Sequence, residues 1–298
     1  MPWIQLQIPA DPDNADQLED LLMEMGSDAV SMEDAADQPL YEPDPGTTPL
    51  WSQTTVTGLF DSGRDIEQLC ADIRDAWHQQ TQQALPEIDV TLVEDKDWER
   101  AWMDDFQPLK FGERLWIVPS WHDAPDPDAA NLMLDPGLAF GTGTHPTTAL
   151  CLEWLDGQDP HGKQVIDYGC GSGILGLAAL LLGADHVIGV DTDPQALEAS
   201  RENARRNGVE DSKLDLFLPD NEPETKADIM LANILAQPLI GLAPHLASRT
   251  RPGGDLVLSG ILSNQAREVM AAYEPWFVMD EPEQREEWIR LTGRRHDR

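Results

Sequence analysis

Three glycines at alternate positions, preceded by an acidic residue, are the feature of this sequence best suited to bind a ligand. They lie in the run Val165-Ile166-Asp167-Tyr168-Gly169-Cys170-Gly171-Ser172-Gly173, which an apolar, helix-like stretch follows. An apolar run, a glycine turn and an apolar helix are typical of a doubly wound sheet, whose ligands lie beyond the carboxyl ends of the strands. We therefore expect Asp167, Gly169 and Gly171 to line a binding site.

A second acidic residue stands at the end of the next expected strand. Val187-Ile188-Gly189-Val190 precedes Asp191, and a carboxylate there can accept hydrogen bonds from both hydroxyls of a ribose. The spacing is G-x-G-x-G rather than the G-x-G-x-x-G of dinucleotide sites, and Asp167 would repel a pyrophosphate. S-adenosylmethionine carries an ammonium and a sulfonium and no phosphate, so the pattern favours it over NAD. A glycine turn without a ligand remains the alternative interpretation.

A segment rich in glycine and threonine precedes this turn, at residues 135–148. Its three glycines and two prolines exclude regular structure before Pro146, which suits the first position of a helix capped by His145 or Thr144. Its hydroxyls and the helix N-terminus suit a carboxylate of the ligand; the threonines that supply the hydroxyls are Thr142, Thr144, Thr147 and Thr148. A structural cap is the favoured role for His145, and a general base is the alternative.

An expected strand over residues 227–232 delivers Asn233-Ile234-Leu235-Ala236 at its carboxyl end. The side-chain amide and the carbonyl of Asn233 can orient a nitrogen or the cofactor, although an asparagine capping the next helix explains it nearly as well. We hypothesise that Phe140, Asn233 and Leu235 frame the space around a reacting amine. No cluster of residues has the spacing of a metal site, so we expect no metal.

Composition excludes several classes of protein. The 298 residues, 41% of them hydrophobic, are enough for two globular domains. We expect a cytoplasmic protein, because no apolar run could span a membrane, no signal peptide is evident and the three cysteines are too widely spaced for a disulfide framework. The net charge of −35 opposes nucleic-acid binding and suits a basic partner. A salty cytoplasm, in which self-repulsion is screened, is the favoured explanation of the same excess of acids, and both explanations can hold together.

The first 94 residues are expected to form a small α+β domain. Strands near residues 3–8, 29–32, 54–60 and 88–93 alternate with helices near 14–25 and 66–77 in the order βαββαβ, which is typical of a ferredoxin-like fold. No catalytic pattern occurs there, and a small domain fused to a cofactor domain often holds the substrate. We expect residues 95–121 to be a linker that contains a short amphipathic helix, residues 97–106.

The remaining residues, 122–298, are expected to form the catalytic domain. After the motifs above, the pattern predicts helices over 174–182 and 194–207 and strands over 214–218 and 256–259. A helix over 263–273 and a hairpin of residues 276–279 with 286–291 close the domain. The expected architecture is therefore an α/β doubly wound sheet preceded by the small domain.

These motifs resemble those of the PrmA family of bacterial ribosomal protein lysine methyltransferases. The resemblance covers essentially the whole chain and is carried by these segments: Met1-Pro2-Trp3, residues 94–100, residues 134–148, the turn 167–173, Asp191, and residues 232–236. It implies a class I methyltransferase domain that uses S-adenosylmethionine, and an N-terminal domain that recognises large-subunit ribosomal protein eleven, free or on the ribosome. It also implies trimethylation of lysine side chains and an N-terminal amine, with cofactor contacts at Thr148, Gly169, Asp191 and Asn233.

The reaction expected from this resemblance is in-line methyl transfer to a neutral amine. A lysine amine must lose its proton first, and a desolvating pocket lowers its pKa, so no dedicated base is obligatory. We expect a monomer that binds neither membrane nor nucleic acid directly. The alternatives are methylation of another protein or of a nucleobase amine, an NAD-dependent dehydrogenase, and a binding module without catalysis.

Overall fold

The computed structural model describes residues 2–35, 52–93, 106–135 and 145–297. The chain divides into two compact units, Met1–Asp105 and Phe106–Arg298. The expected helix of residues 97–106 lies, apart from Phe106, outside the described residues, as do Phe140, Thr142 and Thr144. Residues 106–121, which the sequence analysis groups with the linker, belong to the second unit.

The first unit is a four-stranded antiparallel sheet with two helices. Its elements are β1 (Trp3–Ala10), α1 (Ala15–Glu24), β2 (Ala29–Asp34), β3 (Thr54–Asp61), α2 (Ile66–Thr81) and β4 (Asp89–Val93). The strand order β2-β3-β1-β4 with this connectivity confirms the predicted ferredoxin-like topology. Alternate residues of β1, Ile4, Leu6 and Ile8, are fully buried and form the core with both helices.

The two helices of this unit begin in different ways. The Asp65 side chain caps α2 by accepting the backbone N–H of Gln68 at 3.0 Å. Asn14 occupies the cap position of α1 but makes no side-chain cap bond. Its Oδ1 instead accepts the N–H of Asp11 at 2.9 Å, so this side chain closes the turn that precedes the helix.

An eight-stranded sheet forms the centre of the second unit. Its strands are β8 (Gln164–Tyr168), β9 (His186–Val190), β10 (Leu214–Phe217), β11 (Ala227–Asn233), β12 (Thr250–Leu262), β13 (Phe277–Met279), β14 (Glu283–Arg285) and β15 (Trp288–Arg295). The order is β10-β9-β8-β11-β12-β15-β13, with β14 paired to β15. Strands β8 to β12 are parallel, and β15 is antiparallel to β12 and β13. This confirms the predicted doubly wound class I architecture.

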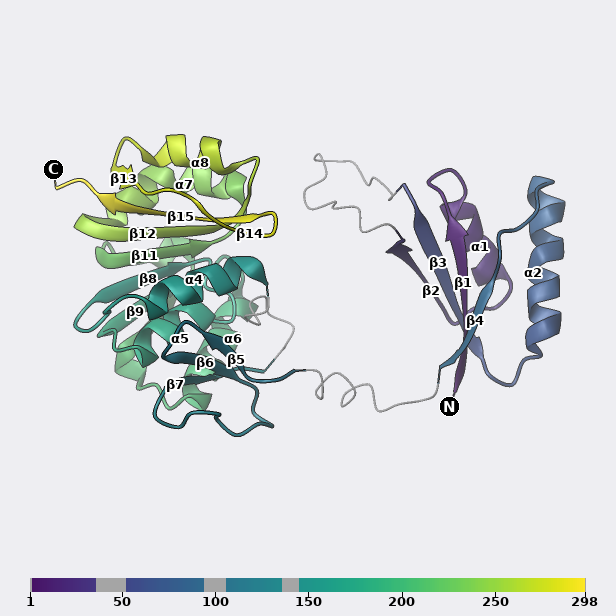
Figure 1. The fold of residues 1–298 in the computed structure, drawn as a ribbon, viewed down its shortest axis with the longest axis horizontal. Coiled ribbons are helices and arrows are strands. Elements are labelled where there is room, and N and C mark those ends of the chain that lie inside the picture. Colours follow the sequence, from purple (N-terminus) through teal and green to yellow (C-terminus); the bar gives the residue numbers. More distant parts are fainter. Residues whose placement is uncertain (1, 36–51, 94–105, 136–144, 298) are drawn as a thin grey trace. The chain divides into compact units, whose positions relative to one another are not determined.

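Helices cover both faces of this sheet (Figure 1). One apolar cluster contains residues of α4 (Pro146–Asp156), α5 (Ile174–Leu181) and α6 (Pro194–Arg206), and the other contains residues of α7 (Ala236–Arg249) and α8 (Ala266–Tyr273). A three-stranded sheet of β5 (Leu109–Phe111), β6 (Leu115–Val118) and β7 (Ala130–Met133) packs against the first cluster. The α5 helix is buried almost all round, as its composition predicts.

The C-terminal part departs from the predicted boundaries. Strand β12 begins at Thr250 rather than Leu256, because its pairing with β11 resumes after an irregularity that takes up Gly253 and Gly254. Helix α8 begins at Ala266 rather than Ser263. The predicted hairpin of 276–279 with 286–291 is wrong in its register: β13 pairs with residues 293–295 of β15, and the hairpin partner of β15 is β14, which the pattern missed because its residues Glu283–Arg285 are all polar.

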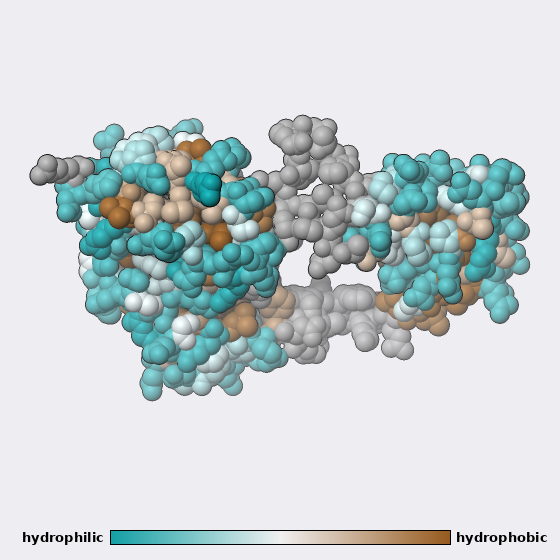
Figure 2. All heavy atoms as spheres, turned by 45° about the horizontal axis from the view of Figure 1, so that its top comes forward, coloured by the Kyte–Doolittle hydropathy of each residue, from teal (hydrophilic) through white to brown (hydrophobic). Residues whose placement is uncertain are grey.

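Hydrophilic side chains dominate the face of each unit that Figure 2 displays, in keeping with the net charge of −35. None of the described helices combines the length and apolar character that a membrane crossing requires.

Candidate active site

The candidate site lies where the chain reverses direction across the sheet. Strand β8 is central, with β9 on one side and β11 on the other, and Asp167 aligns with Gly189 and with Leu231. The residues that follow these strands therefore emerge at one edge. In open α/β sheets this edge, at the point where strand order reverses, is where ligands bind.

The glycine turn after β8 is held against both neighbouring strands. Gly169, Gly171 and Gly173 have φ values of 79°, 54° and 79°, a left-handed conformation that favours glycine. The N–H groups of Gly169 and Cys170 donate to the carbonyl of Val190 at 2.7 and 3.0 Å. A Cβ on Gly169 would lie 2.3 Å from Cγ2 of Ile234, so this turn packs directly against the end of β11.

Asp191 closes the turn from the β9 side. Its Oδ2 accepts the N–H of Gly171 and its Oδ1 accepts the N–H of Asp193, both at 2.9 Å. Each carboxylate oxygen has two lone pairs, so each can accept a further hydrogen bond. The half-buried carboxylate is thus fixed in place and can still bind two hydroxyls.

Asp167 lies beneath the turn rather than on its surface. Its side chain is 1% exposed, and its Oδ2 accepts the N–H of Gly176 at 2.9 Å. This bond serves as the cap of α5, because the residue at the cap position, Gly173, has no side chain to do so. Burial raises the pKa of Asp167 to about 7, repulsion from Asp191 acts in the same direction, and the Gly176 bond opposes both. Among the described residues, its Oδ1 has no hydrogen-bond partner.

The start of α4 brings a third group to the site. Thr148 is 2% exposed, and its Oγ1 accepts the side-chain amide of Asn233 at 3.2 Å. These two residues are 85 positions apart, and both were predicted from sequence to contact the cofactor. Asn233 does not cap α7, whose cap position is Leu235. Leu235 is 51% exposed beside it.

His145 is the cap of α4. Its side chain accepts the N–H of Thr147, which confirms the favoured sequence interpretation of its role. The ring also lies 4.8 Å from the ring of Trp288 in an edge-to-face arrangement. Burial lowers the pKa of His145, and the nearby carboxylates of Glu287 and Glu286 oppose that effect.

Two side chains of helix α6 that were not predicted as site residues hydrogen-bond to the backbone of the glycine turn. Ser200 Oγ donates to the carbonyl of Gly171 at 2.8 Å, and Asn203 Nδ2 donates to the carbonyl of Ser172 at 2.9 Å. Their spacing of three residues places both on one face of the helix, together with its buried Ala196, Leu197 and Ala204, and uncharged polar residues on this apolar face are the signal that could have found them.

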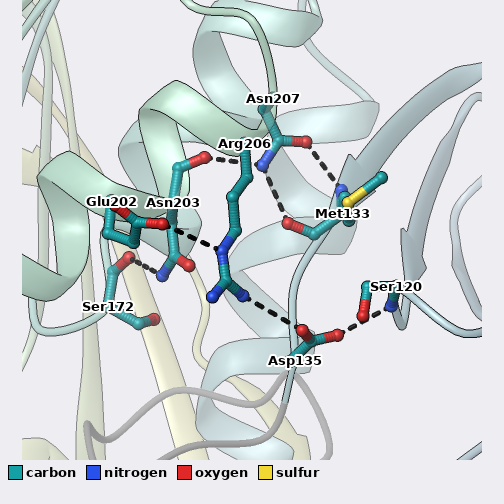
Figure 3. A network of polar contacts seen from close by, with 8 residues as sticks. All are labelled: Ser120, Met133, Asp135, Ser172, Glu202, Asn203, Arg206 and Asn207. Atoms are coloured by element: carbon teal, nitrogen blue, oxygen red, sulfur yellow. Dashed lines mark hydrogen bonds and ion pairs between the residues drawn. The ribbon is translucent and has the colours of Figure 1, made fainter.

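The same helix also holds the end of β7, as Figure 3 shows. Asn207 accepts the N–H of Met133 at 2.7 Å and donates to its carbonyl at 2.8 Å. Arg206 donates to Asp135 at 3.0 Å, and the other oxygen of Asp135 accepts the N–H of Ser120 at 2.7 Å. Helix α6 therefore links the glycine turn to the strand that precedes the Gly- and Thr-rich segment.

The described part of the predicted site is suited to a nucleoside, because the fixed carboxylate of Asp191 suits ribose hydroxyls. Asp167 does not line the site as predicted: it is buried beneath the turn, and the burial that raises its pKa disfavours the negative charge expected to repel a pyrophosphate. The described residues contain no group of three or more His, Cys, Asp and Glu that could hold a metal ion. The predicted site residues that the structure describes all lie at or beside the carboxyl ends of β8, β9 and β11. They are Asp167, Gly169, Gly171, Asp191, Thr148, Asn233 and Leu235.

Known proteins resemble this chain along its whole length. The family described as "Ribosomal protein L11 methyltransferase (PrmA)" matches residues 2–296. A ribosomal protein L11 methyltransferase of Marinobacter nauticus is 89% identical over 297 residues, covering 100% of both chains. One from Pseudomonas aeruginosa is 58% identical over 295 residues, 99% of both chains. A crystal structure of the ribosomal protein L11 methylase of Lactobacillus delbrueckii subsp. bulgaricus, 34% identical, covers 64% of this chain and 100% of its own, with a TM-score of 0.58.

Proposed function

We propose that this chain, which belongs to the ribosomal protein L11 methyltransferase (PrmA) family, transfers methyl groups from S-adenosylmethionine to amines of ribosomal protein L11. The acceptors are lysine side chains and an N-terminal amine, each trimethylated. The observation that carries the proposal is the meeting of Asp191, the glycine turn and the Asn233–Thr148 pair at one sheet edge, in a chain that matches this family from residue 2 to residue 296.

The cofactor is held by groups from three strand ends. S-adenosylmethionine supplies an electrophilic methyl group and a positive charge when it is bound. Asp191 accepts its ribose hydroxyls, and the backbone of Gly169 and Gly171 lies against it because these residues have no side chain. The hydroxyl of Thr148 and the N-terminus of α4, with Thr142 and Thr144, receive its carboxylate.

Asn233 orients the acceptor amine. Its Nδ2 is engaged with Thr148, which fixes the amide plane, and its oxygens can accept an N–H of the amine and so direct the nitrogen lone pair. Phe140 and Leu235 complete the frame around a substituted amine, which must turn between successive methylations. Alignment of this kind contributes up to roughly 7–11 kcal/mol to the lowering of a barrier.

The acceptor amine loses its proton without a dedicated base. A lysine has a pKa of about 10.4 in water. A site that excludes water, and the positive charge of the bound sulfonium, both disfavour the ammonium form. His145 does not take this proton, since its Nδ1 is occupied at the start of α4.

The substrate is recognised by the predicted N-terminal domain, residues 1–94. This segment is rich in acids and contains only two Lys or Arg residues, Arg64 and Arg74, so its field attracts a basic protein. The enzyme works as a monomer in the cytoplasm, on its substrate either free or assembled. Its three described cysteines are free and buried, as a reducing compartment requires.

Purified chain, methyl-labelled S-adenosylmethionine and purified ribosomal protein L11 test the proposal. We expect label in L11 alone, on lysine and N-terminal amines, with up to three methyl groups on one nitrogen by peptide mass spectrometry. Label in another protein or in RNA would assign a different acceptor. Cofactor binding with no transfer to any ribosomal component would leave a binding module and refute the proposal.

A further inference from the structure

His145 is bound at the start of α4 through one ring nitrogen. Its Nδ1 lies 3.3 Å from the backbone nitrogen of Thr147, which donates to it, and 2.8 Å from Oγ1 of the same residue. A cap of this kind satisfies an N–H group that has no partner within the helix. Accepting this N–H takes the lone pair on Nδ1, so the cap requires the neutral ring with its proton on Nε2. A ring protonated on Nδ1 could donate to Oγ1 of Thr147 but could not accept the N–H.

The ring is clamped by a residue far along the chain. Trp288, 8% exposed in β15, lies edge-to-face against it at 4.8 Å and 67°. Trp288 pairs with Leu262 in β12, so the clamp is part of the central sheet. The helix that His145 caps carries Thr148, whose hydroxyl accepts the amide of Asn233.

We propose that His145 is a positioning residue whose neutral ring, held by Trp288, fixes the α4 N-terminus and through it the Thr148–Asn233 pair, and whose protonation releases that pair. The inference rests on the proposed function, because it assigns Asn233 a role in aligning the amine. It differs from general-base catalysis, since the ring exchanges no proton with the substrate.

The groups around the ring determine where it titrates. Glu286 and Glu287, in the β14–β15 hairpin, favour the protonated ring, whereas partial burial disfavours it and lowers the pKa of His145 below its ordinary value. The ring is therefore neutral at pH 7. As the pH falls through the pKa of His145, Nδ1 gains a proton and can no longer accept the backbone N–H of Thr147. Methyl transfer then declines.

Two substitutions separate a cap from a base. His145→Asn replaces the ring with a side chain that is among the best helix caps and does not titrate, whereas His145→Ala removes the cap. The control is His161→Asn, which changes an exposed histidine paired with Asp159. The variants are compared by kcat/KM for L11 from pH 5 to 8, and by NMR of the histidine rings and the Thr147 and Thr148 amides in the full chain.

We expect His145→Asn to stay within about threefold of the wild type at pH 7 and to decline less steeply towards acid pH, since it keeps only the decline that protonation of the acceptor amine causes in every variant. His145→Ala is expected to fall by roughly 3- to 30-fold, the factor that corresponds to the free energy of a lost cap. In the wild type, the Thr147 and Thr148 amide shifts follow the titration of the His145 ring, and in His145→Asn they do not titrate. If His145→Asn is as inactive as His145→Ala, or if its kcat/KM falls towards acid pH as steeply as that of the wild type, the proposal is wrong. If the wild type does not methylate L11, the proposed function fails, while the NMR titration still decides whether the ring is a titrating cap.

Discussion

The carboxylate of Asp167 completes the α5 N-terminus while buried almost entirely from water. A raised folded-state pKa means that ionising this group costs free energy in the folded chain but not in the unfolded one. Stability from this group is present below the unfolded pKa near 3.8 and is lost as pH rises to about 7. We predict that Asp167→Asn removes up to roughly 4 kcal/mol of this pH dependence, measured by urea unfolding between pH 4 and pH 8.

Loss of one negative charge also relieves general repulsion, so the comparison needs a control. Asp185→Asn removes a charge whose side chain is 72% exposed. Its pH dependence is expected to match that of the wild type. If Asp167→Asn behaved like Asp185→Asn, the buried carboxyl would not titrate as described.

The Asn233–Thr148 contact is testable as a unit. We predict that Asn233→Ala and Thr148→Val each lower kcat/KM by roughly 10- to 100-fold, and that the double variant is little worse, because residues that act together are not additive. Thr148→Ser keeps the hydroxyl and is expected to remain within about threefold. If the loss of kcat/KM in the double variant equals the product of the two single losses, Asn233 and Thr148 do not act as a pair.

For single residues, sequence predicted positions at the ends of strands better than the contacts that each side chain makes. Asp167, Asp191 and Asn233 could be predicted because each follows an apolar strand. That Asp167 turns inward to cap α5 could not be foreseen, since it depends on the close approach that Gly176 allows: a Cβ there would lie 2.9 Å from Cγ1 of Val187. Ser200 and Asn203 were missed because a polar residue facing a turn and one facing water look alike in sequence.

Between elements, the turn after β8 and the end of β11 are packed too closely for any side chain at Gly169. We predict that Gly169→Ala destabilises the second unit by about 2 to 4 kcal/mol, because it combines a left-handed residue with a clash against Ile234. Gly162→Ala is the matched control: it has φ of +70° but nothing within 4 Å, so only about 1 to 2 kcal/mol is expected. Equal losses in thermal unfolding would contradict close packing at the turn.

Helix α6 connects the glycine turn to β7. A substitution at its C-terminal end should therefore change the structure of both the turn and the strand. We predict that Asn207→Ala costs about 1 to 3 kcal/mol, from the bonds lost to both backbone groups of Met133. It should also weaken cofactor binding in calorimetry. Asn221→Ala, at an exposed site, should change neither quantity, and an Asn207→Ala chain of normal stability would mean that the network contributes nothing.

Element types followed from periodicity, whereas several boundaries did not. The apolar runs of β8, β9 and β11 define buried parallel strands, but β14 has no apolar residue and exists only because β15 pairs with it. The early start of β12 likewise depends on a bulge against β11. Such features are determined by a neighbouring strand distant in sequence.

The whole molecule carries a net charge of −35, and mutual repulsion of this size opposes folding. Salt shortens the Debye length from about 10 Å at 0.1 M to about 3 Å at 1 M. We predict that the thermal midpoint at pH 7 rises over this range, and that the rise is much smaller near pH 4.2, the isoelectric point of the sequence. A thermal midpoint at pH 7 that does not change with salt would mean that repulsion between the acidic side chains does not destabilise the folded chain.

Isothermal titration of the full chain shows whether Asp191 and the glycine turn select S-adenosylmethionine over NAD. S-adenosylmethionine and NAD are titrated into the wild type, Asp191→Asn and the surface control Asp185→Asn. We predict that S-adenosylmethionine binds the wild type and Asp185→Asn equally and Asp191→Asn roughly tenfold or more weakly, because the amide offers one uncharged acceptor oxygen in place of the two of the carboxylate, while NAD binds none of them. Binding of NAD in place of S-adenosylmethionine, or an affinity for S-adenosylmethionine that Asp191→Asn leaves unchanged, would contradict this selectivity.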